Sequence, residues 1–323
     1  MILPAPWGWV GAAGWKNAGV TKALDDLLDI LDLEAIEVNL FRGRSPEDRR
    51  QRVFGGQVAG QALVAAGRTV DVDRSVHSLH AYFLRPGDPN VPILYEVDRI
   101  RDGRSFTTRR VIAIQHGQAI FNLSASFHVH EEGYEHQFPM PDAPDPDPLP
   151  TLQERMKPLA KELGEWWSRP RAIDIRYVEE PRQMSTAPRP PRQRVWFRAD
   201  GHLPDDPMLH AVVVAYASDM TLLDSVYLPH GVGWEAAGML GASLDHAMWF
   251  HQPFRADDWL LYDQESPTAW GARGLARGTI FRADGALAVS VVQEGLLRPT
   301  QKSVFQTEPS ENATPDAGDV SPA

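Results

Sequence analysis

The chain contains no cysteine among its 323 residues. Disulfide bridges, thiol nucleophiles and thiolate metal sites are therefore excluded. No stretch approaches the roughly 20 apolar residues that a membrane-spanning helix requires. The N-terminus has no basic segment ahead of its apolar part, so we expect no signal peptide. Together with the lack of cysteine, this favours a cytoplasmic protein without a membrane span.

Positive charge is also scarce. The chain has 32 Lys and Arg residues against 43 Asp and Glu residues, which gives a net charge of -11. This balance argues against a nucleic-acid partner, which requires a basic face. A few arginines could still hold the phosphates of a small ligand.

Several motifs of catalytic and cofactor sites are missing. The sequence has no GxSxG, no GxGxxG, no GxxxxGK[ST] and no HExxH. Serine-elbow hydrolases, dinucleotide-binding proteins and P-loop proteins therefore have no support. His128, His130 and His136 lie close together, but we expect them at the surface, where a strand ends. We predict neither a metal nor a cofactor.

The sequence contains two related halves. Residues 78–97, SLHAYFLRPGDPNVPILYEV, align with residues 245–264, DHAMWFHQPFRADDWLLYDQ, at a constant offset of 167. Phe83 then matches Phe250, and Tyr95 matches Tyr262. In each half an apolar helical segment comes first and strand-like runs follow. This order indicates a duplicated unit.

Each half combines one buried helix with a hairpin. The segments 55–70 and 209–228 are apolar on nearly all sides, which predicts helices buried in the protein, with Asp219 inside the second one. The segments 109–129 and 276–297 each contain two strands, joined by the turns HGQ and ADG. The pattern predicts an α+β fold with two curved antiparallel sheets, each wrapped around a long central helix.

The composition also predicts the domain boundaries. We expect a disordered extension over 1–21, a first unit over 22–135 that opens with a helix from Thr21 to about Glu37, and a linker with a short helix over 136–175. A second unit would cover 176–300, and a polar tail over 301–323 would be disordered. The linker includes FPMPDAPDPDPLPT, in which proline excludes helix and central strand.

Several stretches resemble the acyl-CoA thioesterase II family. They include LFRGRSPEDRRQRVFGGQVAGQAL, VHSLHAYFLRPGDP, RDGRSFTTRRVIAIQHGQAIF, VWFRADGHLPDD, LDHAMWFHQPF and VVQEGLLR, and the resemblance covers about residues 22–300. It implies a double hotdog fold and hydrolysis of fatty acyl-CoA to a free acid and CoA. It also implies a homo-oligomer, either a dimer or a dimer of dimers, and no cofactor.

The resemblance further implies a catalytic set of Asp219, Ser243 and Gln293. Asp219 would act as general base for a water molecule that Ser243 and Gln293 orient, because burial raises the pKa of a carboxylate. A covalent acyl-aspartate remains the other route. Ser243 departs from the threonine of the family pattern, and without the methyl group its hydroxyl is less restricted at χ1.

Two further groups of residues are candidates for substrate contacts. Gly55, Gly56 and Gln57 open the first buried helix, whose N–H groups could hold the oxyanion. Arg104, Arg109 and Arg110 could bind the CoA phosphates. The first helix has no acid at the place of Asp219, so we expect one working site per chain.

Two alternatives remain at this point. One is a non-catalytic acyl-CoA binding or sensing protein. The other is a double-hotdog enoyl-CoA hydratase, which would need an Asp/His pair placed for water addition. Asp245 and His246 are adjacent on a predicted strand, however, and adjacent strand residues point to opposite faces.

Overall fold

The computed structural model describes residues 21–46, 52–159, 169–185, 187–232 and 239–299. The N-terminal extension predicted over 1–21 falls outside these residues apart from Thr21, and so does the tail predicted over 301–323. The segments that precede the linker contain α2 (Lys22–Leu31), β1 (Glu34–Glu37), β2 (Leu40–Gly43), α3 (Gly55–Gly67), β3 (Arg74–Phe83), β4 (Ile93–Asp102), β5 (Phe106–Gln115) and β6 (Gln118–Val129).

The remaining segments begin with α4 (Leu152–Met156) and the 3-10 turn η1 (Lys157–Leu159). They continue with β7 (Ile173–Tyr177), η3 (Arg182–Met184), β8 (Arg192–Ala199), α6 (Pro207–Ser218), α7 (Asp224–Tyr227), η4 (Leu228–His230), β9 (Met239–Ser243), β10 (Asp245–Phe250), β11 (Leu260–Trp270), β12 (Arg273–Arg282) and β13 (Leu287–Pro299). β7 thus begins just before the unit boundary predicted at 176.

The strands form the predicted antiparallel arrangement, with one addition. The two curved sheets are continuous, in the order β1-β2-β4-β5-β6-β3-β10-β13-β12-β11-β8-β7, and β9 pairs with β13 outside this path. The halves join between β3 and β10, where Leu79 lies opposite Met248. Both predicted hairpins are present as β5–β6 and β12–β13, and the positive φ of Gly117 and Gly285 explains the glycine in each turn.

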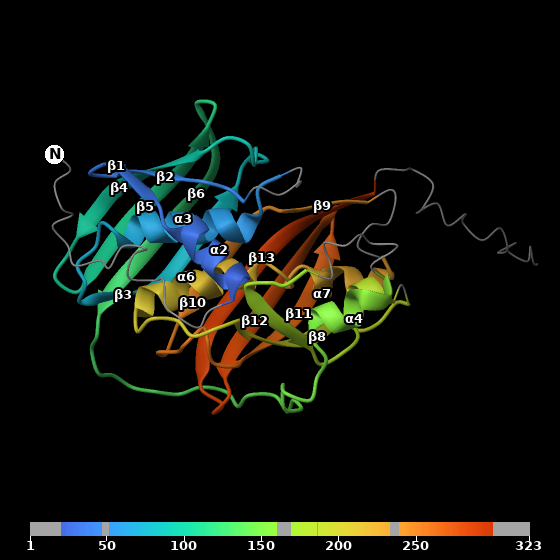
Figure 1. Cartoon of the computed structure of the whole chain (residues 1–323). Coiled ribbons are helices and arrows are strands. Elements are labelled where there is room, and N and C mark those ends of the chain that lie inside the picture. The colour runs from blue at the N-terminus through green and yellow to red at the C-terminus, as the bar shows by residue number, and fades with distance from the viewer. Residues whose placement is uncertain (1–20, 47–51, 160–168, 186, 233–238, 300–323) are drawn as a thin grey trace, which may run out of the picture.

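The two apolar helices lie together in the middle of the molecule (Figure 1). Every residue of α3 from Gly56 to Gly67 is buried, and so are nearly all residues of α6. The helices run antiparallel and very close together. A Cβ atom at Gly56, near the start of α3, would lie 2.3 Å from the carbonyl oxygen of Tyr216, near the end of α6. The start of α3 therefore faces the end of α6.

Two predicted helices are shorter in the structure. α2 ends at Leu31, because residues 34–37 pair with β2 instead. α6 ends at Ser218, so Asp219 caps the helix and does not lie within it. Side chains of the sheet donate hydrogen bonds to backbone carbonyls at this end. The Tyr262 hydroxyl donates to the Ser218 carbonyl at 3.3 Å, and the Gln193 amide donates to the Thr221 carbonyl at 2.8 Å. These tertiary contacts replace the next helical turn.

The proline-rich linker runs along the outer side of the second half (Figure 1). Its carbonyls accept hydrogen bonds from the Trp196 indole at Pro144 and from Arg194 at Asp142. Its apolar residues, among them Met140 and Leu149, pack on a small cluster around Trp196. The proline-rich part of the linker, residues 138–151, is therefore a packed strap without helix or strand, as its prolines require.

Candidate active site

Asp219 is placed where three elements meet. It caps the end of α6, opposite the first residues of α3, and a Cβ atom at Gly55 would lie 2.6 Å from its Oδ2 atom. Ser243 is the last residue of β9, and Gln293 lies on β13, the strand that pairs with β9. The structure thus brings together all three residues of the predicted set.

Hydrogen bonds join these three side chains directly. The Gln293 amide nitrogen donates to Asp219 Oδ1 at 2.6 Å and lies 2.8 Å from Ser243 Oγ. The Ser243 hydroxyl lies 3.3 Å from the same Oδ1 atom. Gln293 is completely buried, at 0% exposure, whereas Asp219 and Ser243 retain some exposed surface. Asp219 and Ser243 are therefore not completely enclosed within the protein.

Burial raises the pKa of Asp219 above its ordinary value. Nearby His246 and the hydrogen bonds from Gln293 and Ser243 act in the opposite direction. A further hydrogen bond from the Gly56 N–H at the start of α3 also favours the ionised carboxylate. The carboxylate is thus poised to accept a proton nearer to neutral pH than an exposed aspartate.

A buried polar layer that the sequence pattern did not predict supports the end of α6. The side chain of Ser218 contacts His246 Nε2 at 2.8 Å. Gln264 donates to the Thr221 hydroxyl at 2.6 Å and accepts from Gln193 at 2.7 Å. Polar residues at inward strand positions were the available signal, because buried polar groups require partners.

The glycines that open α3 lie at the site, but Gln57 does not. Phe54 is the N-cap residue, and its side chain has no atom that could bond the first N–H groups. The Gln57 N–H donates to the Phe54 carbonyl at 3.1 Å, and its side-chain amide donates to the Arg44 carbonyl and to Ser45 Oγ. Gly55 and Gly56 are therefore the residues of α3 that lie beside Asp219, and the Gly56 N–H donates to its carboxylate.

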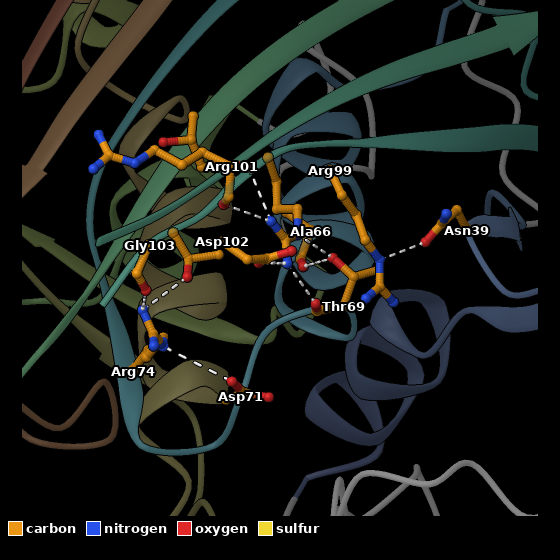
Figure 2. A network of polar contacts seen from close by, with 12 residues as sticks. Asn39, Ala66, Thr69, Asp71, Arg74, Arg99, Arg101, Asp102 and Gly103 are labelled. Atoms are coloured by element: carbon orange, nitrogen blue, oxygen red, sulfur yellow. Dashed lines mark hydrogen bonds and ion pairs between the residues drawn. The ribbon is translucent and has the colours of Figure 1, made fainter. Parts of the chain in front are cut away.

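The three predicted arginines lie far from this end of α3. Arg109 is buried at 1% exposure, and its guanidinium donates to the hydroxyl and carbonyl of Thr69, to the carbonyls of Arg101 and Thr108 and to Asp102. Figure 2 shows the surroundings of Thr69, Arg101 and Asp102. Thr69 follows the opposite end of α3, about 20 Å from Gly55 by the helical rise. These bonds occupy Arg109, so the prediction that it binds CoA phosphate does not suit its position.

The other two arginines are exposed. Arg110 pairs with Asp98 at 2.8 Å, and the Arg104 carbonyl accepts a hydrogen bond from Arg74.

Asp245 and His246 do not form a catalytic pair. Asp245 accepts from the Glu294 N–H at 2.6 Å, while His246 points into the protein. Within the described residues we find no cluster of three or more His, Asp or Glu side chains that could hold a metal ion, and no helix long and apolar enough to cross a membrane.

Comparison with known proteins identifies the family of the chain. A family model described as acyl-CoA thioesterase matches residues 173–296, and one described as the acyl-CoA thioesterase N-terminal domain matches residues 45–128. Acyl-coenzyme A thioesterase 8 of Mus musculus is 44% identical over 315 residues, which cover 92% of this chain and 97% of the mouse protein.

Solved structures agree with this result. The crystal structure of an acyl-CoA thioesterase II from Mycobacterium marinum is 48% identical, with a TM-score of 0.71 over 84% of this chain and 98% of that chain. A hot dog fold protein from Alicyclobacillus acidocaldarius, at 19% identity, shares the fold with a TM-score of 0.69 over 86% of this chain and 99% of that chain. The relatives are thioesterases, which favours hydrolysis over the binding-protein and hydratase alternatives. The chain belongs to the acyl-CoA thioesterase II family and is an acyl-CoA thioester hydrolase with a double hotdog fold.

Proposed function

We propose that the chain hydrolyses fatty acyl-CoA, with Asp219 as general base and Ser243 and Gln293 as the groups that position the reacting water. The observation that carries this proposal is the convergence of the three side chains from α6, β9 and β13 within 3.3 Å of one another. A water molecule bound to Asp219 would lie within reach of the other two. The raised pKa of the buried carboxylate, caused by desolvation, suits the role of base.

The reaction then proceeds in two steps. Asp219 takes a proton from water while the water oxygen bonds to the thioester carbonyl carbon, and the carbonyl electron pair moves to its oxygen. The tetrahedral intermediate collapses, the carbon–sulfur bond breaks, and the proton held by Asp219 passes to the leaving sulfur of CoA. The products are the free acid and CoA. A covalent acyl-aspartate would instead add the acyl group to the protein mass during turnover.

The oxyanion of the intermediate would be held at the start of α3. Gly55 lies next to Asp219, at the positive end of the helix dipole, and the Gly56 N–H, which donates to the carboxylate, would pass to the oxyanion once Asp219 holds the proton of the water. Gln57 is no longer part of this proposal, because its N–H and its amide already have partners. Arg104 and Arg110 remain the proposed contacts for CoA phosphate, which a rise in KM after replacement by alanine would support.

The decisive experiment measures CoA release from a short, a medium and a long acyl-CoA. Wild type should turn over at least one of them, and Asp219→Asn should lower kcat by about 10² or more. Binding of acyl-CoA by the variant, measured by calorimetry, should persist. A variant that retains wild-type kcat would rule out Asp219 as the base. Wild type that binds all three substrates without turnover would contradict the hydrolase itself.

We further propose that the chain forms a homo-oligomer in the cytoplasm. The support is the resemblance to a family whose chains associate and the lack of cysteine, which suits a reducing compartment. Light scattering after size-exclusion chromatography should give a mass of two or four chains. A monomer at micromolar concentration would contradict the first part, and recovery from a membrane fraction would contradict the second.

A further inference from the structure

The proposed role of Gln293 depends on which way its amide points. The two ends of a glutamine amide have nearly the same shape, but one donates and the other accepts hydrogen bonds. In the structure the nitrogen faces Asp219 Oδ1 at 2.6 Å and Ser243 Oγ at 2.8 Å. Rotation by half a turn would place the amide oxygen against the carboxylate. A donor to the oxygen end would add to the preference that the carboxylate itself gives for the nitrogen end.

The imidazole of His246 lies beside that oxygen end. His246 belongs to β10 and is buried at 1% exposure. Its Nε2 atom contacts Ser218 Oγ at 2.8 Å. Its Nδ1 atom and the Gln293 Oε1 atom are both buried, and neither has a fully formed bond to another atom of the described residues. The two side chains nonetheless lie close enough for a hydrogen bond between them to act on the pKa of His246. We infer that the two remaining atoms face each other.

This contact selects one form of the ring. With the proton on Nδ1, the ring donates to Gln293 Oε1, and the single proton of the Ser218 hydroxyl goes to Nε2 at 2.8 Å and not to the Ala215 carbonyl at 3.0 Å. With the proton on Nε2, the lone pair of Nδ1 would face the lone pairs of Oε1, and both buried atoms would lack a partner. The first arrangement satisfies every polar atom of the three side chains.

The ring is also held neutral by its surroundings. Burial lowers the pKa of His246, while Asp219, the contact with Gln293, and Asp245 act in the opposite direction. Tyr262 also interacts with Asp219, and burial raises its pKa well above the ordinary value. At neutral pH the imidazole and the phenol of this cluster are therefore both uncharged.

We propose that His246 is a positioning residue, whose Nδ1–H group holds the oxygen end of Gln293 so that the amide nitrogen must face Asp219 and Ser243. The inference rests on the proposed function of Asp219. The chain of contacts runs from Ser218 through His246 and Gln293 to Asp219, the neighbour of Ser218 in the sequence. Through His246, Ser218 at the end of α6 thus helps to fix the orientation of Gln293, the proposed catalytic partner of Asp219.

Two substitutions separate the two ring nitrogens. His246→Asn places an amide nitrogen near the position of Nδ1, whereas His246→Gln places one near the position of Nε2. We expect His246→Asn to keep kcat within about threefold of wild type, and His246→Gln to lower kcat about tenfold or more with little change in KM. His246→Gln should also move the acidic limb of the kcat/KM profile to higher pH, because Asp219 loses a donor.

A matched control is another buried histidine, on α6. His210 of α6 is buried at 3% exposure and accepts the Ala256 N–H at its Nδ1 atom, outside the cluster. His210→Gln should lower stability without moving the pH profile. If His246→Gln lowers only stability, as the control does, or if both His246 variants lose activity equally, the proposal fails.

The nitrogen of His246 that carries the proton can also be identified directly, in an experiment that does not depend on the activity of a variant. Nitrogen NMR on wild type labelled at its 11 histidines should show one neutral ring protonated at Nδ1, a signal that His246→Asn removes. A ring protonated at Nε2 would overturn the proposal. Failure of the proposed function gives a different result, because Asp219→Asn would then stay active whatever the form of the ring.

Discussion

The ends of α3 and α6 are supported in a similar way, but the supporting side chains differ in charge. A buried threonine follows each helix end, Thr69 two residues after α3 in the first half and Thr221 three residues after α6 in the second. Arg109 binds the hydroxyl and the carbonyl of Thr69. Two neutral glutamines bind the same two groups of Thr221. Two residues before the threonine stands Gly67 in one half and Asp219 in the other.

The difference shows how a duplicated fold keeps one candidate site. In the first half a permanently charged guanidinium fills the space behind the helix end. In the second half the supporting groups are neutral, so the carboxylate of Asp219 carries the local negative charge. The helix starts differ as well. The side chain of Asp206 caps α6, whereas Phe54 leaves the first N–H groups of α3 free to face Asp219. The asymmetry agrees with the expectation of one working site per chain.

Replacement of Arg109 gives the largest expected change in stability. Arg109→Met leaves the carbonyls of Thr69, Arg101 and Thr108 without their donor, so the free energy of unfolding should fall by about 3 kcal/mol. Denaturant unfolding measures this effect. The exposed neighbour Arg110, replaced in the same way, should change stability by about 0.5 kcal/mol or less. If Arg109→Met instead raises KM for acyl-CoA and leaves stability unchanged, the result would support binding of the CoA phosphates by Arg109.

Gly55→Ala should damage activity more than stability. The new methyl group would lie 2.6 Å from Asp219 Oδ2, so the carboxylate must move, and kcat should fall by about 10². Gly60→Ala is the matched control in the same helix, because its methyl group would meet the flexible end of Leu31 at 3.0 Å. Steady-state kinetics and thermal unfolding on both variants test this. Equal kcat in the two variants would show that the start of α3 is not part of the site.

The raised pKa of Asp219, caused by burial, predicts opposite effects of pH on activity and stability. The rate constant kcat/KM should fall as the pH drops through the raised pKa, because the base becomes protonated. The carboxyl group contributes most to stability below its pKa in the unfolded chain, and this contribution is lost as the pH rises through the folded pKa. Asp219→Asn should therefore raise Tm relative to wild type at neutral pH and less at acidic pH. If Asp219→Asn is less stable than wild type at every pH, the result would contradict the claim that burial raises the pKa of Asp219.

Ser243→Thr should have the smallest effect. The added methyl group restricts χ1 and favours one orientation of the hydroxyl near Asp219 Oδ1, so kcat should rise by no more than about threefold. Ser243→Ala provides the contrast. It removes a donor to the carboxylate, so the acidic limb of the kcat/KM profile should move to higher pH. Equal profiles for the serine, threonine and alanine forms would mean that the hydroxyl takes no part.

Local pattern was enough to predict much of the fold. The apolar faces of α3 and α6, the hairpins β5–β6 and β12–β13, and the duplication follow from periodicity and turn residues that act over a few positions. The residues Asp219, Ser243 and Gln293 came from resemblance to a family, since nothing in their own spacing marks them. Pattern alone also extended the helix past Asp219, because the apolar run continues to Leu228.

Only the tertiary structure decided how the site is built. Gln293 and Asp219 are 74 positions apart, and their contact depends on the pairing of β13 with β9 and on the end of α6. The burial of Arg109, the supporting contacts of His246 and the approach of Gly55 to Asp219 depend in the same way on packing between elements. The sequence determined which elements form, because propensity and periodicity are local properties. Which side chains meet was decided by sheet register and helix packing, which join distant parts of the chain.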